Sequence, residues 1–240
     1  MSEDAFCRTK MLLGEEGFSR LQNSFVVIAG VGAVGGYVLE ALVRAGVGKI
    51  RVVDFDVLKK SNLNRQILAL NSLLEIPKIE AAAQRVQDIN PDCNLETVKA
   101  FIDKDNLPDI LAGKPDVLVD AIDVVKAKAE LLTYASLQGI KTFSAMGAAL
   151  RMHPEFIRTA SLDKTKCCPL AALMRKELRN QKVCLDNITC VYSEEVVKIK
   201  PDSQDENGKR ILGSLSTLTG IVGLTLANEV ILHIIGENKK

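Results

Sequence analysis

The 240-residue sequence has no tryptophan, only 4% aromatic residues and only two histidines. Proteins that bind single-stranded nucleic acids commonly stack the bases on aromatic side chains. The low aromatic content therefore disfavours a binding module of that kind. A charge excess of one sign is also missing, because 31 Lys and Arg residues stand against 30 Asp and Glu residues. Any nucleic acid or anionic membrane must therefore be met by a local patch.

The six cysteines include no CxxC pair, which most structural zinc sites need. Cys167 and Cys168 are adjacent, and Cys184 and Cys190 are too widely spaced, so a tetrahedral zinc site is disfavoured. The N-terminal stretch MSEDAFCRTK lacks the basic and apolar regions of a signal peptide. We therefore expect a cytoplasmic protein whose cysteines are free thiols.

One long apolar segment, residues 212–235, is long enough to be mistaken for a membrane span. It carries Asn228, Glu229 and His233 and has no aromatic belt. We expect a helix packed on a sheet, with His233 in the core, and no membrane partner.

Between residues 25 and 147, short β-rich apolar runs alternate with segments of helical period, which predicts an α/β fold. We expect a Rossmann-like, mostly parallel sheet with helices on both faces. The expected division is an N-terminal helical segment over 1–24, a nucleotide-binding core over 25–155 and a C-terminal extension over 156–240, packed as one structural domain. The expected core strands are 25–30, 49–56, 117–123 and 140–147, and the expected core helices are 38–46, 79–89 and 127–139.

The stretch GVGAVGG joins the first strand to the first core helix. Gly30, Gly32 and Gly35 fit GxGxxG, in which the glycines allow a tight turn, close approach of a ligand and close helix–strand packing. The helix N-terminus offers N–H groups to phosphate, and Asp54 after the second strand can accept hydrogen bonds from a ribose. By themselves these features suggest an NAD site, with a purely structural glycine turn as the alternative.

The residues after Asp54 favour a triphosphate over a nicotinamide dinucleotide. Asn62 and Arg65 follow the second strand, Lys78 opens the next helix, and Asp123 is expected to close the strand VLVDAID. Cations offset the charge that develops when an α-phosphorus is attacked, and a carboxylate can hold Mg²⁺. The alternatives are solvated surface charges for Arg65 and Lys78, and a helix cap for Asp123.

The motifs GVGAVGG, VVDFD, SNLNRQ, PKIEAA and DAID together resemble the nucleotide site of the ThiF/MoeB/HesA superfamily, relatives of the ubiquitin-activating enzymes. Members of that superfamily bind ATP and adenylate a carboxylate. Position 33 is Ala where relatives usually have Gly. The residues that the resemblance implies around ATP are Gly30, Gly32, Ala33, Gly35, Asp54, Asp56, Asn62, Asn64, Arg65, Lys78 and Asp123. Asp123 is also implied as the Mg²⁺ ligand.

The C-terminal motifs, CCPLAALMRKELR and ITCVYSEE among them, are similar to one branch of this superfamily, the tRNA threonylcarbamoyladenosine dehydratases. The resemblance implies that the threonyl carboxylate of a modified adenosine in tRNA is adenylated, and that its ureido group then closes a ring with loss of AMP. One alternative is an activator of a ubiquitin-like sulfur carrier, disfavoured by the missing CxxC pairs. Another is a nucleotide sensor without catalysis, disfavoured because Arg65, Lys78 and Asp123 are all present.

The resemblance also implies partners. It implies a homodimer in which Arg8 reaches the partner's ATP, tRNA as substrate, and a sulfur-transfer or redox protein as a further candidate partner. The local basic candidates for tRNA contact are Lys59, Lys60, Arg175, Lys176, Arg179, Lys182, Lys239 and Lys240.

Cys190 in ITCVYSEE matches a cysteine of this branch. A thiol there could take the acyl group from AMP as a thioester. The alternative is packing, because Ile188, Cys190 and Tyr192 alternate on one face of a strand.

Overall fold

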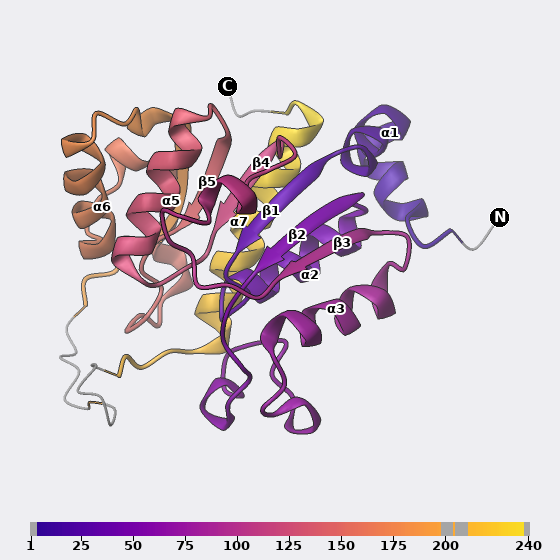
Figure 1. Cartoon of the computed structure of the whole chain (residues 1–240), viewed down its shortest axis with the longest axis horizontal. Helices are drawn as coiled ribbons and strands as arrows, with labels where there is room; N and C mark the ends of the chain where they lie inside the picture. The colour runs from indigo at the N-terminus through magenta and orange to yellow at the C-terminus, as the bar shows by residue number, and fades with distance from the viewer. Residues whose placement is uncertain (1–3, 198–203, 205–210, 238–240) are drawn as a thin grey trace.

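The computed structural model describes residues 4–197, 204 and 211–237, and it places seven strands in one sheet (Figure 1). The strand order is β3-β2-β1-β4-β5-β7-β6, and only β6 runs antiparallel to its neighbour. The predicted α/β, Rossmann-like, mostly parallel sheet is therefore confirmed. The strands are β1 Phe25–Ala29, β2 Lys49–Val53, β3 Asn94–Val98, β4 Val117–Asp120, β5 Lys141–Ala145, β6 Ile157–Ser161 and β7 Ile188–Ser193. The helices are α1 Cys7–Gln22, α2 Gly35–Ala45, α3 Lys78–Ile89, α4 Leu107–Ile110, α5 Val125–Leu137, α6 Pro169–Asn180 and α7 Ser216–Ile235.

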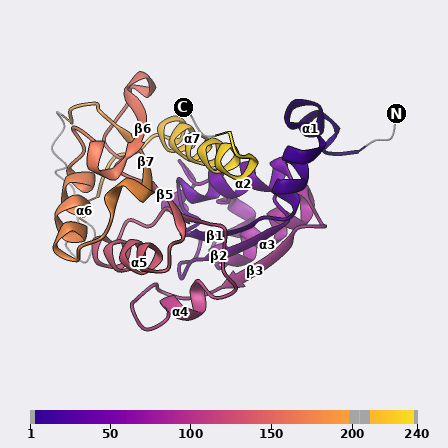
Figure 2. The same ribbon diagram turned by 90° about the horizontal axis from the view of Figure 1, so that it is seen from above.

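Helices cover both faces of the sheet (Figure 2). Successive residues of a strand point to opposite faces. Val26 and Ile28 of β1 thus share a core with α2, α3 and α7, whereas Val27 shares the opposite core with α4 and α5. A third cluster lies between α5, α6 and β7. All three clusters include residues of the same seven-stranded sheet, and β7 and β6 form one end of that sheet.

Helix α7 packs on the sheet as the sequence predicts. By length and composition alone it is apolar enough to cross a membrane. Its residues Val222, Leu226 and Val230, spaced one helical turn apart, are buried in the core beside α2. The His233 ring lies 5.7 Å from the ring of Phe143 on β5.

Two predicted strand ends are wrong, since β2 stops at Val53 and β4 stops at Asp120. In both cases an aspartate turns the chain out of the sheet. Asp54 Oδ1 accepts a hydrogen bond from the Asp56 N–H at 2.9 Å, and Asp120 Oδ1 accepts one from the Ile122 N–H at 3.3 Å. Such i to i+2 bonds replace the strand pairing with a turn.

Because of these turns, Asp123 lies in a loop beyond β4 rather than closing the strand. The edge strand β3 has no counterpart among the expected strands, because its residues are polar and only partly buried. The polar segment 201–210 lies outside the described residues except for Gln204.

Candidate nucleotide site

The glycine loop joins β1 to α2 in the predicted way. Gly30 has φ +85°, a left-handed conformation that favours glycine, and its N–H donates to the Val53 carbonyl at 2.8 Å. A Cβ at Gly35 would lie 1.8 Å from the Gly30 carbonyl oxygen, so only glycine fits there. No side chain caps the start of α2. The Gly36 and Tyr37 N–H groups instead donate to the Gly32 and Val34 carbonyls at 3.1 and 3.0 Å, so an anion would be bound by the loop that precedes the helix.

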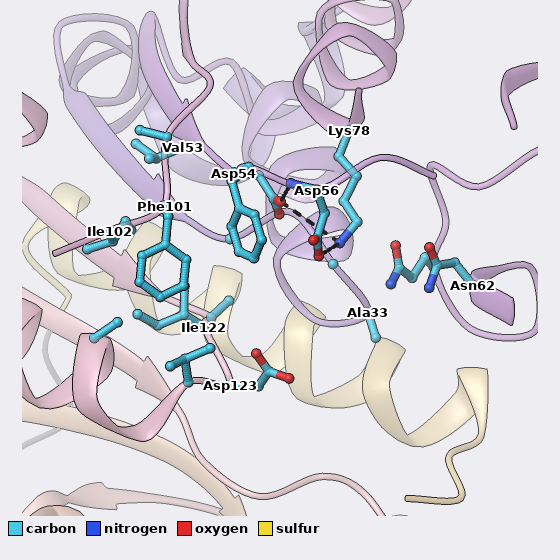
Figure 3. Close-up of a pocket in the computed structure, with 18 of the residues that line it drawn as sticks. Ala33, Val53, Asp54, Asp56, Asn62, Lys78, Phe101, Ile102, Ile122 and Asp123 are labelled. Atoms are coloured by element: carbon cyan, nitrogen blue, oxygen red, sulfur yellow. Dashed lines mark hydrogen bonds and ion pairs between the residues drawn. The ribbon is translucent and has the colours of Figure 1, made fainter. Parts of the chain in front are cut away.

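A cavity of about 260 Å³ lies at the carboxyl ends of β1, β2 and β4 (Figure 3). Ligands bind at this edge of open parallel sheets. The predicted site residues that line it are Gly30, Gly32, Ala33, Asp54, Asp56, Asn62, Arg65, Lys78 and Asp123. The predicted residues that do not line it are Arg8, Gly35, Asn64 and Cys190.

Asp54 and Lys78 are held firmly at the back of this cavity. Asp54 is 9% exposed, and its Oδ2 accepts a hydrogen bond from the Val31 N–H at 2.9 Å. Lys78 is the first residue of α3 and is 5% exposed. Its Nζ donates to Asp56 Oδ2 at 2.7 Å and lies 3.9 Å from Asp54 Oδ1. The cavity thus has a fixed cation between two carboxylates.

Asn62 and Arg65 belong to the segment that closes one side of the cavity. Asn62 ends a short 3-10 helix, and its Oδ1 accepts a hydrogen bond from the Lys59 N–H at 2.9 Å. Arg65 Nη1 donates to the Ser61 carbonyl at 2.9 Å and to Asn64 Oδ1 at 2.8 Å. These local bonds hold Arg65 at the edge of the cavity.

The sequence places Gln66 near the nucleotide-binding edge of the sheet, with Asn62 and Arg65, but does not assign it to the site. It lines the cavity, is 7% exposed, and its Oε1 has no hydrogen-bond partner in the described structure. A buried polar atom left unsatisfied costs about 1–3 kcal/mol, so a polar ligand or water would stabilise it. The space beside Gly32 is open, because a Cβ there would meet only Gln66 Nε2, at 3.8 Å. The site therefore has room for a polar ligand against the glycine loop.

The opposite wall of the cavity is apolar. Phe101, Ile102 and Ile122 lie on one side, while Lys78 and Asn62 lie on the other (Figure 3). Phe101 follows β3 and makes an edge-to-face contact with Phe55, with ring centroids 5.1 Å apart. Sequence reasoning missed this wall because no motif marks it. An apolar wall on one side, with Lys78 and the glycine loop in the same cavity, suits a base at one end and phosphates at the other.

Asp123 is exposed in the loop that begins beyond β4, and it lines the cavity. The N-cap residue of α5 is Val124, so Asp123 lies one residue before the cap position. Among the described residues no group of three or more metal-ligating side chains occurs. Mg²⁺ commonly takes one or two carboxylates plus substrate phosphates, and a carboxylate that lines the same cavity as the glycine loop fits that pattern.

Arg8 and Asn64 lie away from the cavity. Arg8 is exposed near the start of α1. The nearby Phe6 ring packs on Phe18, with centroids 5.4 Å apart, and the Gly48 N–H donates to the Leu21 carbonyl, so α1 lies at the end of the sheet where β1 and β2 begin (Figure 1). The cavity lies at the other end of these strands. Asn64 Nδ2 donates to the Ser214 carbonyl at 3.1 Å and so ties the segment to the start of the C-terminal chain.

Cys190 is fully buried in the cluster between α5, α6 and β7, with Leu132 and Met174. Burial, the dominant cause, raises the pKa of its thiol. A nucleophilic cysteine needs an accessible thiolate. The arrangement favours packing, and the thioester role stays a prediction.

One of the basic side chains on helix α6, Arg175, is hydrogen-bonded within the protein. Arg175 Nη1 donates to the Thr165 carbonyl at 2.9 Å and to the Thr165 hydroxyl. Lys176, Arg179 and Lys182 are exposed. Of the other predicted tRNA contacts, Lys59 and Lys60 are exposed, and Lys239 and Lys240 lie outside the described residues.

The chain is similar to known proteins over nearly all of its length. The profile of the ThiF family matches residues 6–240. The chain is 34% identical to tRNA threonylcarbamoyladenosine dehydratase 2 of Saccharomyces cerevisiae, over 92% of this chain and 54% of the yeast protein. It is 31% identical to tRNA threonylcarbamoyladenosine dehydratase of Bacillus subtilis, over 97% of this chain and 95% of that protein.

Its fold is also similar to that of a solved dehydratase. The crystal structure of Escherichia coli tRNA N6-threonylcarbamoyladenosine dehydratase, TcdA, in complex with ATP superposes with a TM-score of 0.88 and 30% identity. The superposition covers 97% of this chain and 94% of that one. The chain therefore spans about half of the yeast relative and nearly all of the two bacterial ones.

Proposed function

Because the chain belongs to the ThiF family, we propose that it uses ATP to adenylate a carboxylate, the threonyl carboxylate of N6-threonylcarbamoyladenosine in tRNA. The activated group then closes to the cyclic form as AMP leaves. One observation carries this proposal. The glycine loop, Lys78, Arg65 and Asp123 line one cavity, and 97% of the chain superposes on the structure of a dehydratase in complex with ATP.

The cavity residues divide the work by charge. The backbone N–H groups of the glycine loop bind phosphate oxygens, and Lys78 and Arg65 offset the negative charge that develops as the carboxylate attacks the α-phosphorus. Asp123 would hold Mg²⁺, which neutralises phosphate charge when bound. The buried Gln66 Oε1 and the Phe101 wall orient the rest of the nucleotide.

Ring closure needs no nucleophile from the protein. The substrate carries its own ureido nitrogen, which attacks the acyl carbon of the adenylate, loses its proton and displaces AMP. Groups held within one small molecule react at very high effective concentration. This account is consistent with the buried position of Cys190.

Arg8 has a role in this scheme only through a second copy of the chain. It is exposed on α1 at the end of the sheet opposite the cavity, so it does not reach the ATP of its own chain. We propose a homodimer in which Arg8 contacts the phosphates bound by its partner.

The decisive experiment measures ATP–pyrophosphate exchange with three additions. These are tRNA that carries threonylcarbamoyladenosine, tRNA transcribed without modification, and a sulfur-carrier protein with a C-terminal Gly-Gly. We expect exchange only with the modified tRNA, and mass spectrometry of its nucleosides should show the loss of one water. Exchange with the carrier protein alone would instead favour the sulfur-carrier alternative.

A further inference from the structure

A buried ion pair lies directly behind the cavity. Lys128 on α5 and Asp120 at the end of β4 are both 0% exposed, and Lys128 Nζ lies 2.6 Å from Asp120 Oδ2. The Ser144 hydroxyl on β5 donates to the same carboxylate oxygen at 2.6 Å. Sequence reasoning gave none of these residues a role.

The two charges hold both peptide groups of one loop residue, Ile122. Asp120 Oδ1 accepts a hydrogen bond from the Ile122 N–H at 3.3 Å, and Lys128 Nζ donates to the Ile122 carbonyl at 3.3 Å. Lys128 Nζ also donates to the Ala145 carbonyl at 2.9 Å, at the end of β5. Ile122 immediately precedes Asp123, so the pair fixes the backbone from which that carboxylate projects.

Stability alone does not explain such a pair. Removing two charges from water costs several kcal/mol per ion, and apolar replacements of a buried pair are often neutral or stabilising. The loop that it holds lines the cavity from Ala121 to Val124. A rigid backbone there matters because a displacement of about 1 Å at a reacting group can cost about a hundredfold in rate.

We propose that Asp120 and Lys128 form a positioning pair that sets the Asp123 carboxylate for ATP and its metal ion. The inference rests on the proposed function, in which Asp123 serves adenylation. Ser144 supports the pair by fixing the Asp120 side chain.

The test replaces both charges at once, with Asp120→Asn and Lys128→Met in one chain, so that no buried charge is left unpaired. We expect adenylation to fall by about tenfold or more, with an increase in the Mg²⁺ concentration needed for half the maximal rate. Adding Asp123→Asn should then cost no more than Asp123→Asn alone, within about twofold, because the pair acts through that residue. If the rate losses of the double variant and of Asp123→Asn multiply when the three substitutions are combined, the proposal is overturned. An unchanged rate in the double variant would overturn it as well.

A second readout does not depend on catalysis. Amide hydrogen exchange of residues 121–124 without nucleotide should accelerate in the double variant, and less strongly in Ser144→Ala, which retains both charges. Unchanged exchange in both variants would overturn the proposal even if tRNA proves not to be the substrate. If the double variant does not fold, Ser144→Ala carries both the kinetic and the exchange measurements.

Arg51→Met is the matched control. Arg51 also pairs with a carboxylate, Glu96, and donates to the carbonyls of Ile110 and Ala112 at 2.8 Å. It does not line the cavity. We expect this variant to lose stability and to retain the wild-type rate and the wild-type exchange at residues 121–124.

Discussion

Lys78 Nζ lies 2.7 Å from Asp56 Oδ2 and 3.9 Å from Asp54 Oδ1, inside a cavity that also contains the glycine loop. Asp54 and Asp56 lie in the turn that follows β2, and Lys78 is the first residue of α3. The lysine therefore has an anionic partner before any ligand is bound. An incoming phosphate would share this cation with Asp56.

Lys78→Met should lower ATP–pyrophosphate exchange by about a hundredfold, because it removes a cation that offsets charge in the transition state. Lys126→Met is the control, since Lys126 is a lysine with an 86% exposed side chain on helix α5. Equal effects of the two substitutions on exchange would contradict the placement of Lys78 at the phosphates.

Asp123→Asn should preserve the fold and part of the ATP binding and should lower adenylation by about a hundredfold or more. The amide retains the shape of the side chain but is a poor Mg²⁺ ligand. Circular dichroism and calorimetric ATP titration with and without Mg²⁺ check the first two points. Asp105→Asn, in an exposed loop, is the control. Near-normal exchange in folded Asp123→Asn would remove Asp123 from the proposed metal site.

A mixture of Arg8→Ala and Asp123→Asn chains should recover part of the lost activity. In a mixed dimer one of the two sites combines the intact Arg8 of one chain with the intact Asp123 of the other. Differently tagged chains, purified by both tags, supply verified mixed dimers for the exchange assay. If these mixed dimers show no recovery, Arg8 does not act across the interface.

Cys190→Ala should leave AMP release and formation of the cyclised nucleoside within about twofold of wild type, since intramolecular attack suffices. The free energy of unfolding should fall by about 1–2 kcal/mol, because the smaller side chain leaves a void in a fully buried position. The two products are measured separately. Loss of both AMP release and cyclisation, with ATP–pyrophosphate exchange retained, would instead support a thioester at Cys190.

The free energy of unfolding should decrease as the pH rises from 9 towards 11. Burial raises the pKa of the Cys93 thiol from its ordinary value of 9.0 to about 11. The unfolded chain then loses this proton first, so ionisation favours unfolding across that interval. Urea unfolding of Cys93→Ala should show a weaker pH dependence than wild type, whereas Cys184→Ala, at an exposed cysteine, should match wild type.

The glycine loop and the start of α3 could be predicted because their signals are local. Gly30 needs a left-handed φ and Gly35 must touch the Gly30 carbonyl, so the residue types reveal the turn directly. The end of β4 was mispredicted because the apolar run continues through Ala121 and Ile122 after the chain has left the sheet. Those two side chains face the cavity instead of a neighbouring strand.

The alternation of β-rich and helical segments, read along the chain, already specified the sheet and the edge at which a nucleotide would bind. Residue periodicity and backbone conformation depend on residues that are close in the sequence, so they can be predicted from the sequence alone. The meeting of Asp120 with Lys128 and Ser144, the burial of Cys190 and the Phe101 wall arise from packing between separate elements. Such contacts depend on how α5, β5 and β7 lie against one another, and only the folded chain sets those distances.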